Sequence, residues 1–404
     1  MKPNQLITNK NYKYLYLAGI TSEFGSYLLD TALMLWLFSI TEHEKIYLGL
    51  SRAIFILFLT LGSILGGAAG DRLNKKTLLI ICESIRIPVV LLMILYPTVL
   101  ILLLGNGIIA FFTGVFNPAR QALVNELVGA EHINTANSIF ATTLAFLHFV
   151  CPVVAALLFT RYQSLSEIGA FDIATFLLGI FFLLKIELKI GEMGESEGQS
   201  YFQMIKSGLS YAKKRNDLTW LYLNTVFQGL AIGILIPLLL PFTIEHLKLS
   251  ESHYGYLIGA FGLGGILGGI LSNSLNKVLK TTHLILLCFL LEPVIMLIWL
   301  NIIQFWLSMA AILTWGICVF IRIPSQMNFI SHSVPKGYLS RVFALLEMSF
   351  IVPNIMGGLV VALAGSQLNT YDFLEITAIL YCASLIVRIP IPGCKTFLKT
   401  AKKS

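Results

Sequence analysis

The chain has 404 residues, of which 56% are hydrophobic and 12% are charged, and its mean hydropathy is +0.81. Soluble globular domains carry about 25% charged residues, so this composition excludes a soluble globular protein and indicates a chain that lies mostly in lipid. The formal net charge of +7 does not indicate nucleic-acid binding, because the basic residues are scattered over many loops.

Twelve apolar runs follow one another, and each is long enough to cross a hydrocarbon core of about 30 Å as a helix. In lipid, runs of this length satisfy their backbone hydrogen bonds as helices. We therefore predict an all-α integral membrane protein with twelve transmembrane helices. The first run lacks a small-residue cleavage site and is interpreted as a retained helix rather than a signal peptide. The predicted spans are roughly 13–38, 47–69, 78–97, 99–122, 134–159, 165–186, 218–243, 254–274, 283–301, 304–327, 341–364 and 372–392.

Lysine and arginine are distributed unevenly between the two sides of these spans. If the amino terminus is cytoplasmic, 22 of the 28 basic residues, Arg120 among them, fall in inner loops, tails and inner span ends. Cytoplasmic loops carry this excess, and an even number of spans returns the chain to the side where it began. We therefore predict a multi-pass protein of the plasma (cytoplasmic) membrane with both termini in the cytoplasm.

A repeat divides the chain into halves. Leu61–Lys75 reads LGSILGGAAGDRLNK and Leu263–Lys277 reads LGGILGGILSNSLNK, with nine identities in fifteen positions at an offset of 202 residues. Both copies end a predicted span on the cytoplasmic side, the second and the eighth. The repeat therefore predicts two parallel, pseudo-symmetric six-helix halves, residues 1–190 and 218–404, joined by a cytoplasmic linker at 191–217.

The linker is the one long polar segment of the sequence. Phe202, Ile205 and Leu209 follow helical spacing and are surrounded by basic residues. Two interpretations stay open: a short helix on the inner membrane surface, or a solvated connection.

The segment Gly67–Lys76 (GAAGDRLNKK) combines a glycine, an Asp-Arg pair and two further lysines. It resembles the loop between helices two and three of major facilitator superfamily transporters, and two parallel six-helix halves agree with that resemblance. Four further segments resemble the macrolide-efflux branch of bacterial drug exporters: Asn11–Gly25, Phe116–Leu123, Ala170–Ala174 and Tyr338–Phe343. The resemblance implies transport of small molecules by drug/proton antiport.

The same loop is the predicted conformational gate. Its glycines allow a neighbouring helix to approach closely, and Asp71 is placed where a carboxylate can face a helix amino terminus or an arginine. The resemblance implies that this acid pairs with the start of span eleven when the inner side is shut. For the basic residues, the alternative is that they only set topology. The gate comprises Gly67, Asp71, Arg72, Lys75, Lys76 and Arg341.

Ionisable side chains inside a span are costly unless they face a cavity or a partner, so each is a candidate functional residue. Estimated depths predict two buried ion pairs, Glu23 with Arg86 and Asp30 with Arg52; for Arg52, snorkelling toward the outer surface is the alternative. Arg322 and Glu347 are placed at similar depth. Nine such residues lie within the predicted spans and away from their ends: Glu23, Asp30, Glu83, Asp172, Glu292, Glu347, Arg52, Arg86 and Arg322.

Three of the acids, Glu83, Asp172 and Glu292, have no obvious basic partner on another helix and are candidates to carry a proton. For Glu83, a local pair with Arg86 is the alternative. Glu23 and Asp30, seven residues apart, share one face of span one and are predicted to line the central cavity. The predicted substrate and proton-coupling residues are Glu23, Asp30, Arg52, Glu83, Arg86 and Glu292.

Two features bear on coupling. Val150–Ala156 (VCPVVAA) resembles the proline-glycine stretch of the superfamily's antiporters, and Pro152 is predicted to bend span five. The arginine that the family commonly has midway along span four is absent between Asn106 and Phe112. Proton coupling is therefore carried by other acids or is absent.

Together these patterns predict a secondary exporter of small neutral or cationic amphiphiles of the drug or macrolide type. It would work by alternating access with proton-coupled antiport. The alternative is export of an anionic siderophore or metabolite, or lysophospholipid flipping, with Arg52, Arg86 and Arg322 as ligand anchors.

An enzyme is disfavoured because the sequence has no phosphate-binding loop, metal-spaced His/Glu motif or nucleophile arrangement. Five of the six cysteines lie in apolar spans without metal-type spacing, so neither disulfides nor a metal cluster are expected. The expected partners are an amphiphilic substrate, protons and the bilayer, with no nucleic acid, no cofactor and a monomeric state.

Overall fold

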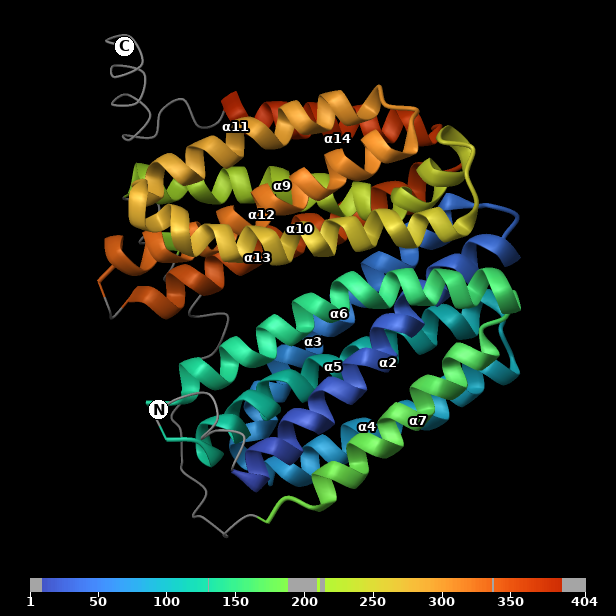
Figure 1. Cartoon of the computed structure of the whole chain (residues 1–404), viewed down its shortest axis with the longest axis vertical. Helices are drawn as coiled ribbons and strands as arrows, with labels where there is room; N and C mark the ends of the chain where they lie inside the picture. Colours follow the sequence, from blue (N-terminus) through green and yellow to red (C-terminus); the bar gives the residue numbers. More distant parts are fainter. Residues whose placement is uncertain (1–8, 130, 188–208, 211–214, 336–337, 387–404) are drawn as a thin grey trace. The chain divides into compact units, whose positions relative to one another are not determined.

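The computed structural model describes residues 9–129, 131–187, 209–210, 215–335 and 338–386, and in this part of the chain helices and their connections occur without any strand (Figure 1). Each of the twelve predicted spans overlaps one long helix, which confirms the all-α prediction. The helices are α2 (Lys10–Ile40), α3 (Lys45–Arg72), α4 (Lys75–Leu95), α5 (Val99–Leu127), α6 (Ile133–Tyr162), α7 (Ser166–Leu184), α9 (Asn216–Pro241), α10 (Glu251–Val278), α11 (Thr281–Leu300), α12 (Phe305–Ser333), α13 (Leu339–Ala364) and α14 (Thr370–Ile386), and a π-helical turn η1 (Phe242–His246) continues α9.

Ten of these helices are long and apolar enough to cross a membrane. The other two are α2, whose polar residues lower its hydropathy, and α14, which is 17 residues long in the described part of the chain. Several helices run past their predicted span ends. The largest extensions are at α5 and α12, which continue to Leu127 and Ser333.

The surface of the helices is apolar where a soluble protein would be polar. On α11, an exposed stripe lies opposite Glu292, whose side chain has no exposed area. A polar interior behind an apolar exterior is the arrangement expected for a helix in lipid. The exposed stripe consists of Leu287, Leu290, Leu291, Val294, Leu297 and Ile298.

The chain divides into two compact units. The N-terminal unit comprises Met1–Tyr47, Ile54–Glu197 and Glu251–Gly255, and the C-terminal unit comprises Leu48–Ala53, Gly198–Ser250 and Tyr256–Ser404. The predicted linker at 191–217 falls mostly outside the described residues, so its two interpretations stay open.

The helices pair in the same way within each unit. In the N-terminal unit, α2 packs on α6 and α7, and α4 packs on α5 and α7 (Figure 1). In the C-terminal unit, α9 packs on α13 and α14, and α11 packs on α12 and α14. The first, third, fifth and sixth helices of one unit thus have the partners of their counterparts in the other, as a parallel repeat requires.

Glycines account for the repeated sequence. A Cβ atom at Gly62 of α3 would overlap the carbonyl oxygen of Phe111 on α5, so only glycine permits this approach. At the offset of 202 residues, Gly264 of α10 meets the carbonyl oxygen of Leu313 on α12 in the same way. The repeat therefore preserves one backbone-to-backbone contact between the second and fourth helices of each unit.

This contact predicts that Gly62→Ala lowers stability, because the added methyl group meets backbone that cannot rotate away. We expect a loss of about 1–3 kcal/mol, typical of overpacking, measured as a lower thermal unfolding midpoint in detergent. Gly67→Ala is the matched control, since a Cβ atom at Gly67 meets nothing within 4 Å. Equal midpoints for the two variants would contradict the assignment.

Candidate functional site

A buried polar cluster lies inside the N-terminal unit, where α2, α4, α5 and α7 meet. Glu83 and Arg86 stand three residues apart on α4, which places them on one helix face. Asp172 reaches the cluster from α7. The exposed fraction is 0% for Glu83, 2% for Arg86 and 0% for Asp172, so the cluster contains three ionisable side chains that water does not reach in this structure.

Arg86 is held on several sides. Its Nη1 atom donates a hydrogen bond to Ser22 Oγ on α2 at 3.2 Å and lies 3.6 Å from Glu83 Oε2. The guanidinium carbon is 5.3 Å from the ring centre of Phe116 on α5 and 5.4 Å from that of Phe176 on α7. Contact with aromatic faces stabilises a desolvated cation, so Arg86 is a fixed positive charge at the centre of the unit.

Asp172 packs against the backbone of α2. Thr175 Oγ1 donates to the Asp172 carbonyl oxygen at 2.7 Å and approaches its Oδ1 atom at 3.4 Å. A Cβ atom at Gly25 of α2 would overlap both Thr175 Oγ1 and Asp172 Oδ1. Gly25 therefore allows α2 to cover this carboxyl group directly.

Glu23 lies beside the cluster, not within it. Both Arg86 and Arg120 are near enough to Glu23 to interact with it electrostatically. The predicted ion pair of Glu23 with Arg86 is nevertheless wrong: Arg86 pairs with Glu83, and Glu23 makes no ion pair with any described residue. The prediction compared only the depths of Glu23 and Arg86 in the membrane. Depth does not determine which neighbouring acid the Arg86 guanidinium contacts.

Arg120 is a buried residue that the sequence analysis placed among the inner charges. It lies inside α5, 9% exposed, with its guanidinium carbon 3.6 Å from the ring centre of Phe140 on α6. The helix continues to Leu127, beyond the predicted span end at 122, so Arg120 lies inside the helix with a buried side chain. The repeat held a usable signal, since Arg120 precedes Arg322 by 202 residues.

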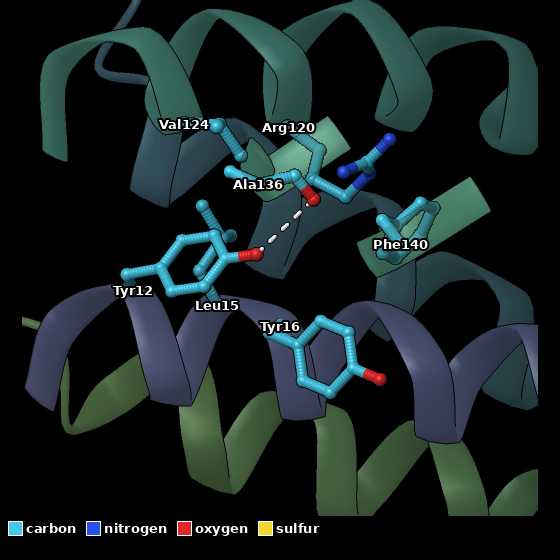
Figure 2. Close-up of a pocket in the computed structure, with 7 residues that line it drawn as sticks. All are labelled: Tyr12, Leu15, Tyr16, Arg120, Val124, Ala136 and Phe140. Carbon is cyan, nitrogen blue, oxygen red and sulfur yellow. Dashed lines mark hydrogen bonds between the residues drawn. The ribbon is translucent and has the colours of Figure 1, made fainter. Parts of the chain in front are cut away.

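Figure 2 shows Arg120 at a small pocket between α2, α5 and α6. Tyr12 Oη donates to the Ala136 carbonyl oxygen at 3.2 Å, and Tyr16 Oη lies 2.6 Å from Thr143 Oγ1. Both hydroxyl groups thus have partners within the protein. The pocket is lined by Tyr12, Leu15, Tyr16, Arg120, Val124, Ala136 and Phe140.

The C-terminal unit contains a second buried cluster, and its charges are balanced. Arg322 Nε on α12 lies 2.6 Å from Glu292 Oε1 on α11, and Gln228 Nε2 on α9 donates to Glu292 Oε2 at 3.1 Å. Arg322 Nη1 donates to Gln326 Oε1 at 3.1 Å. Each carboxylate oxygen of Glu292 therefore accepts a hydrogen bond.

This cluster corrects one prediction, that Glu292 has no basic partner on another helix. Glu347, which was placed at a depth similar to that of Arg322, has an exposed side chain in the structure. Arg322 reaches Glu292 because α12 packs against α11. The helices α11 and α13 both adjoin α12 in the sequence, so the estimated depth of a residue does not determine which of them carries the partner of Arg322.

Two of the predicted gate residues, Lys75 and Lys76, contact the ends of neighbouring helices in the N-terminal unit. Lys75 Nζ pairs with Glu126 Oε1 of α5 at 2.5 Å. Lys76 Nζ donates to the carbonyl oxygens of Leu184 and Ile186, at 3.0 and 2.8 Å, where α7 ends. The two lysines therefore join the ends of α4, α5 and α7.

For the other predicted gate residues, the structure describes fewer contacts. Gly67 is exposed, and the side chains of Asp71 and Arg72 lie outside the described residues. Arg341 has its guanidinium carbon 5.4 Å from the ring centre of Tyr338. The gate as a whole stays a prediction.

The predicted stripe of span one lies on a partly exposed face of α2. Glu23, Ser26, Tyr27 and Asp30 are all partly exposed, whereas Ser22, between this stripe and the cluster, is buried. The Tyr27 ring centre is 4.2 Å from that of His148 on α6. The position of these polar groups away from the unit's core agrees with a role toward a ligand, which stays a prediction.

The remaining predicted residues are Arg52 and Pro152. Arg52 is partly exposed on α3, and its predicted pairing with Asp30 stays a prediction. Pro152 is buried inside α6, next to Cys151, whose Sγ atom approaches the carbonyl oxygen of Phe24 on α2 at 3.8 Å. No cluster of side chains suited to a metal ion occurs among the described residues.

Comparison with known proteins identifies the class. The family model of the Major Facilitator Superfamily matches residues 15–358. The solved structure of a mutant of the nucleoside transporter NupG resembles this chain with a TM-score of 0.77 at 12% identity, covering 95% of this chain and 99% of NupG. The chain belongs to the Major Facilitator Superfamily and is a multi-pass membrane transporter; the comparisons give transporters and not enzymes.

Two curated relatives are similar to this chain in sequence. The putative bacilysin exporter BacE of Bacillus subtilis (strain 168) is 28% identical over 44% of this chain and 43% of BacE. The staphyloferrin A transporter of Staphylococcus aureus (strain NCTC 8325 / PS 47) is 21% identical over 66% of this chain and 67% of that protein. The chain thus aligns with less than half the length of this BacE.

The balanced cluster predicts strong coupling between Glu292 and Arg322. Arg322→Gln leaves the buried Glu292 carboxylate without its basic partner, with the Gln228 hydrogen bond remaining, and we expect a loss of about 3–5 kcal/mol, measured as a lower unfolding midpoint in detergent. In the double variant Glu292→Gln/Arg322→Gln, the loss is smaller than the sum of the single losses.

Lys75→Gln is the matched control for this prediction. Its partner Glu126 is 50% exposed, so the expected loss is about 0–1 kcal/mol. Additive effects at Glu292 and Arg322 would show that the two side chains do not form the pair described.

Proposed function

We propose that this transporter is a secondary active exporter of small neutral or cationic amphiphiles of the drug or macrolide type, driven by inward movement of protons. The observation that carries the proposal is the state of the buried arginines. Arg86 and Arg322 are both engaged by carboxylates, whereas Glu23, an acid on the partly exposed face of α2, makes no ion pair with any described residue. Such a surface favours cationic or neutral ligands over anions.

The direction of transport is supported by similarity to a putative bacilysin exporter. In the superfamily, two six-helix halves exchange access to a substrate site from one side of the membrane to the other. We propose the same cycle for this chain, with both termini in the cytoplasm, in the plasma membrane, and with the monomer as the working unit. The loop at Gly67–Lys76 and Arg341 would close the inner side.

A second candidate is export of an anionic siderophore, and similarity to the staphyloferrin A transporter favours it. The arginines first considered as anchors fit this function poorly, since Arg86 and Arg322 already have carboxylate partners. Arg120, which makes no ion pair with any described residue, is the anchor this function would use.

The proposal predicts proton-driven uptake of cationic or neutral amphiphiles into inside-out vesicles that contain the purified protein. With the vesicle interior acidified, we expect accumulation that collapses when a protonophore removes the pH gradient. Glu23→Gln and Asp30→Asn should each reduce initial uptake by about tenfold or more, the effect of removing a charge-assisted contact of about 1.5–3 kcal/mol.

Glu167→Gln is the control, because Glu167 is an exposed acid in the first turn of α7 and should leave uptake unchanged. Uptake limited to anionic compounds, insensitive to Glu23→Gln and Asp30→Asn and lost in Arg120→Gln, would replace the proposal with the siderophore function.

A further inference from the structure

The buried cluster of the N-terminal unit contains more acids than bases. Glu83 pairs with the Arg86 guanidinium, and Asp172 is near enough to interact electrostatically with the same group. If both acids were ionised, the cluster would carry a net charge of −1 with no exposed area on either acid. An uncompensated charge buried in a membrane helix is costly.

The hydrogen bonds of the cluster also disfavour two ionised carboxylates. The Ser22 hydroxyl and Arg86 lie beside Glu83, but neither Glu83 oxygen accepts a hydrogen bond of normal length and angle, and only one of the two Asp172 oxygens does. Glu83 lies against Gly179 of α7, where a Cβ atom would come 3.8 Å from its Cδ atom, and Asp172 lies against Gly25 of α2. Each acid thus packs against a glycine, which offers no side-chain donor to stabilise a carboxylate.

The C-terminal unit provides an internal comparison. Glu292 has one guanidinium to itself, and both of its oxygens accept hydrogen bonds, from Arg322 and Gln228. This pair is neutral as it stands and needs no proton. The two units therefore treat buried acids differently within one repeated fold.

The remaining charged groups around the cluster do not remove the imbalance. From α2, Glu23 interacts electrostatically with Arg86, and Arg120 of α5 acts on Glu23. From α4, the Cys82 thiol is buried beside Arg86 and is ordinarily neutral. Counting Glu23 and Arg120 gives three acids and two bases, so the net charge is still −1.

From this geometry we infer that Glu83 and Asp172 form a single proton-binding site that holds one proton at neutral pH. Binding of one proton changes the charge of the Glu83, Asp172 and Arg86 cluster from −1 to 0, and its release restores −1. The two carboxyl groups titrate as a pair, so the proton belongs to both. That the proton is the one exchanged for substrate rests on the proposed function; the site itself does not.

The test is infrared spectroscopy of the purified full chain in lipid nanodiscs at neutral pH, without substrate, where protonated carboxyl groups absorb separately from carboxylates. We expect one deuterium-sensitive protonated carboxyl group in this cluster. Glu83→Gln and Asp172→Asn should each abolish its signal, because each leaves one carboxylate with Arg86. Arg86→Gln should raise the signal to two groups, because both acids then lack a base.

Glu292→Gln is the matched control, a buried acid whose removal should leave the signal unchanged. Circular dichroism and size-exclusion chromatography establish that each variant is folded, and the single acid variants support the inference even if Arg86→Gln does not fold. Absence of the signal from the wild-type protein would overturn the inference. Its loss in Glu23→Gln together with its persistence in Glu83→Gln and Asp172→Asn would move the proton to Glu23.

The outcome is separable from that of the proposed function. A chain that shows the expected infrared pattern but takes up amphiphiles without regard to the pH gradient would keep the proton site and reject proton-coupled export. Gradient-driven uptake together with an unchanged signal in both acid variants would reject this site and keep the function.

Discussion

A charge placed among apolar helices has to be neutralised where it stands, and this constraint explains the internal order of both units. In the C-terminal unit, Glu292 and Arg322 fix α11 against α12, and Gln228 adds α9. In the N-terminal unit, Arg86 is enclosed by Ser22, Phe116 and Phe176, so that one cation contacts three neighbouring helices. In lipid, the hydrophobic effect does not favour one helix pair over another. These polar contacts therefore determine which helices pack together.

The two units share their backbone contacts but differ in how their buried charges are paired. The glycine contact of α3 with α5 recurs between α10 and α12 at the same offset, so the backbone arrangement is shared. Arg120 and Arg322 are related by the same offset, yet Arg322 pairs with an acid while Arg120 stacks on Phe140. Divergence has therefore occurred in the side chains between the helices and not in the contacts that set their spacing.

Much of the fold could be predicted from sequence because it depends on properties local to the chain. Apolar run length gave all twelve helices, and the LGSILGG repeat marked the glycines that α3 and α10 use for close contact. The site could be predicted only in part. Glu83, Arg86 and Asp172 were recognised as buried ionisable residues, but the partner of Glu292 depended on which helices are adjacent, and the burial of Arg120 on how α5 meets Phe140 of α6. Neither property is local.

The hydrogen bonds of Lys76 have a mechanical consequence. By donating to the carbonyl oxygens of Leu184 and Ile186, this side chain joins the start of α4 to the end of α7, where the helix dipole favours a cation. Lys75 adds the end of α5 through Glu126. The two neighbouring lysines thus tie the start of α4 to the ends of two other helices, so a displacement of α4 at this edge of the N-terminal unit would have to break contacts with both α5 and α7.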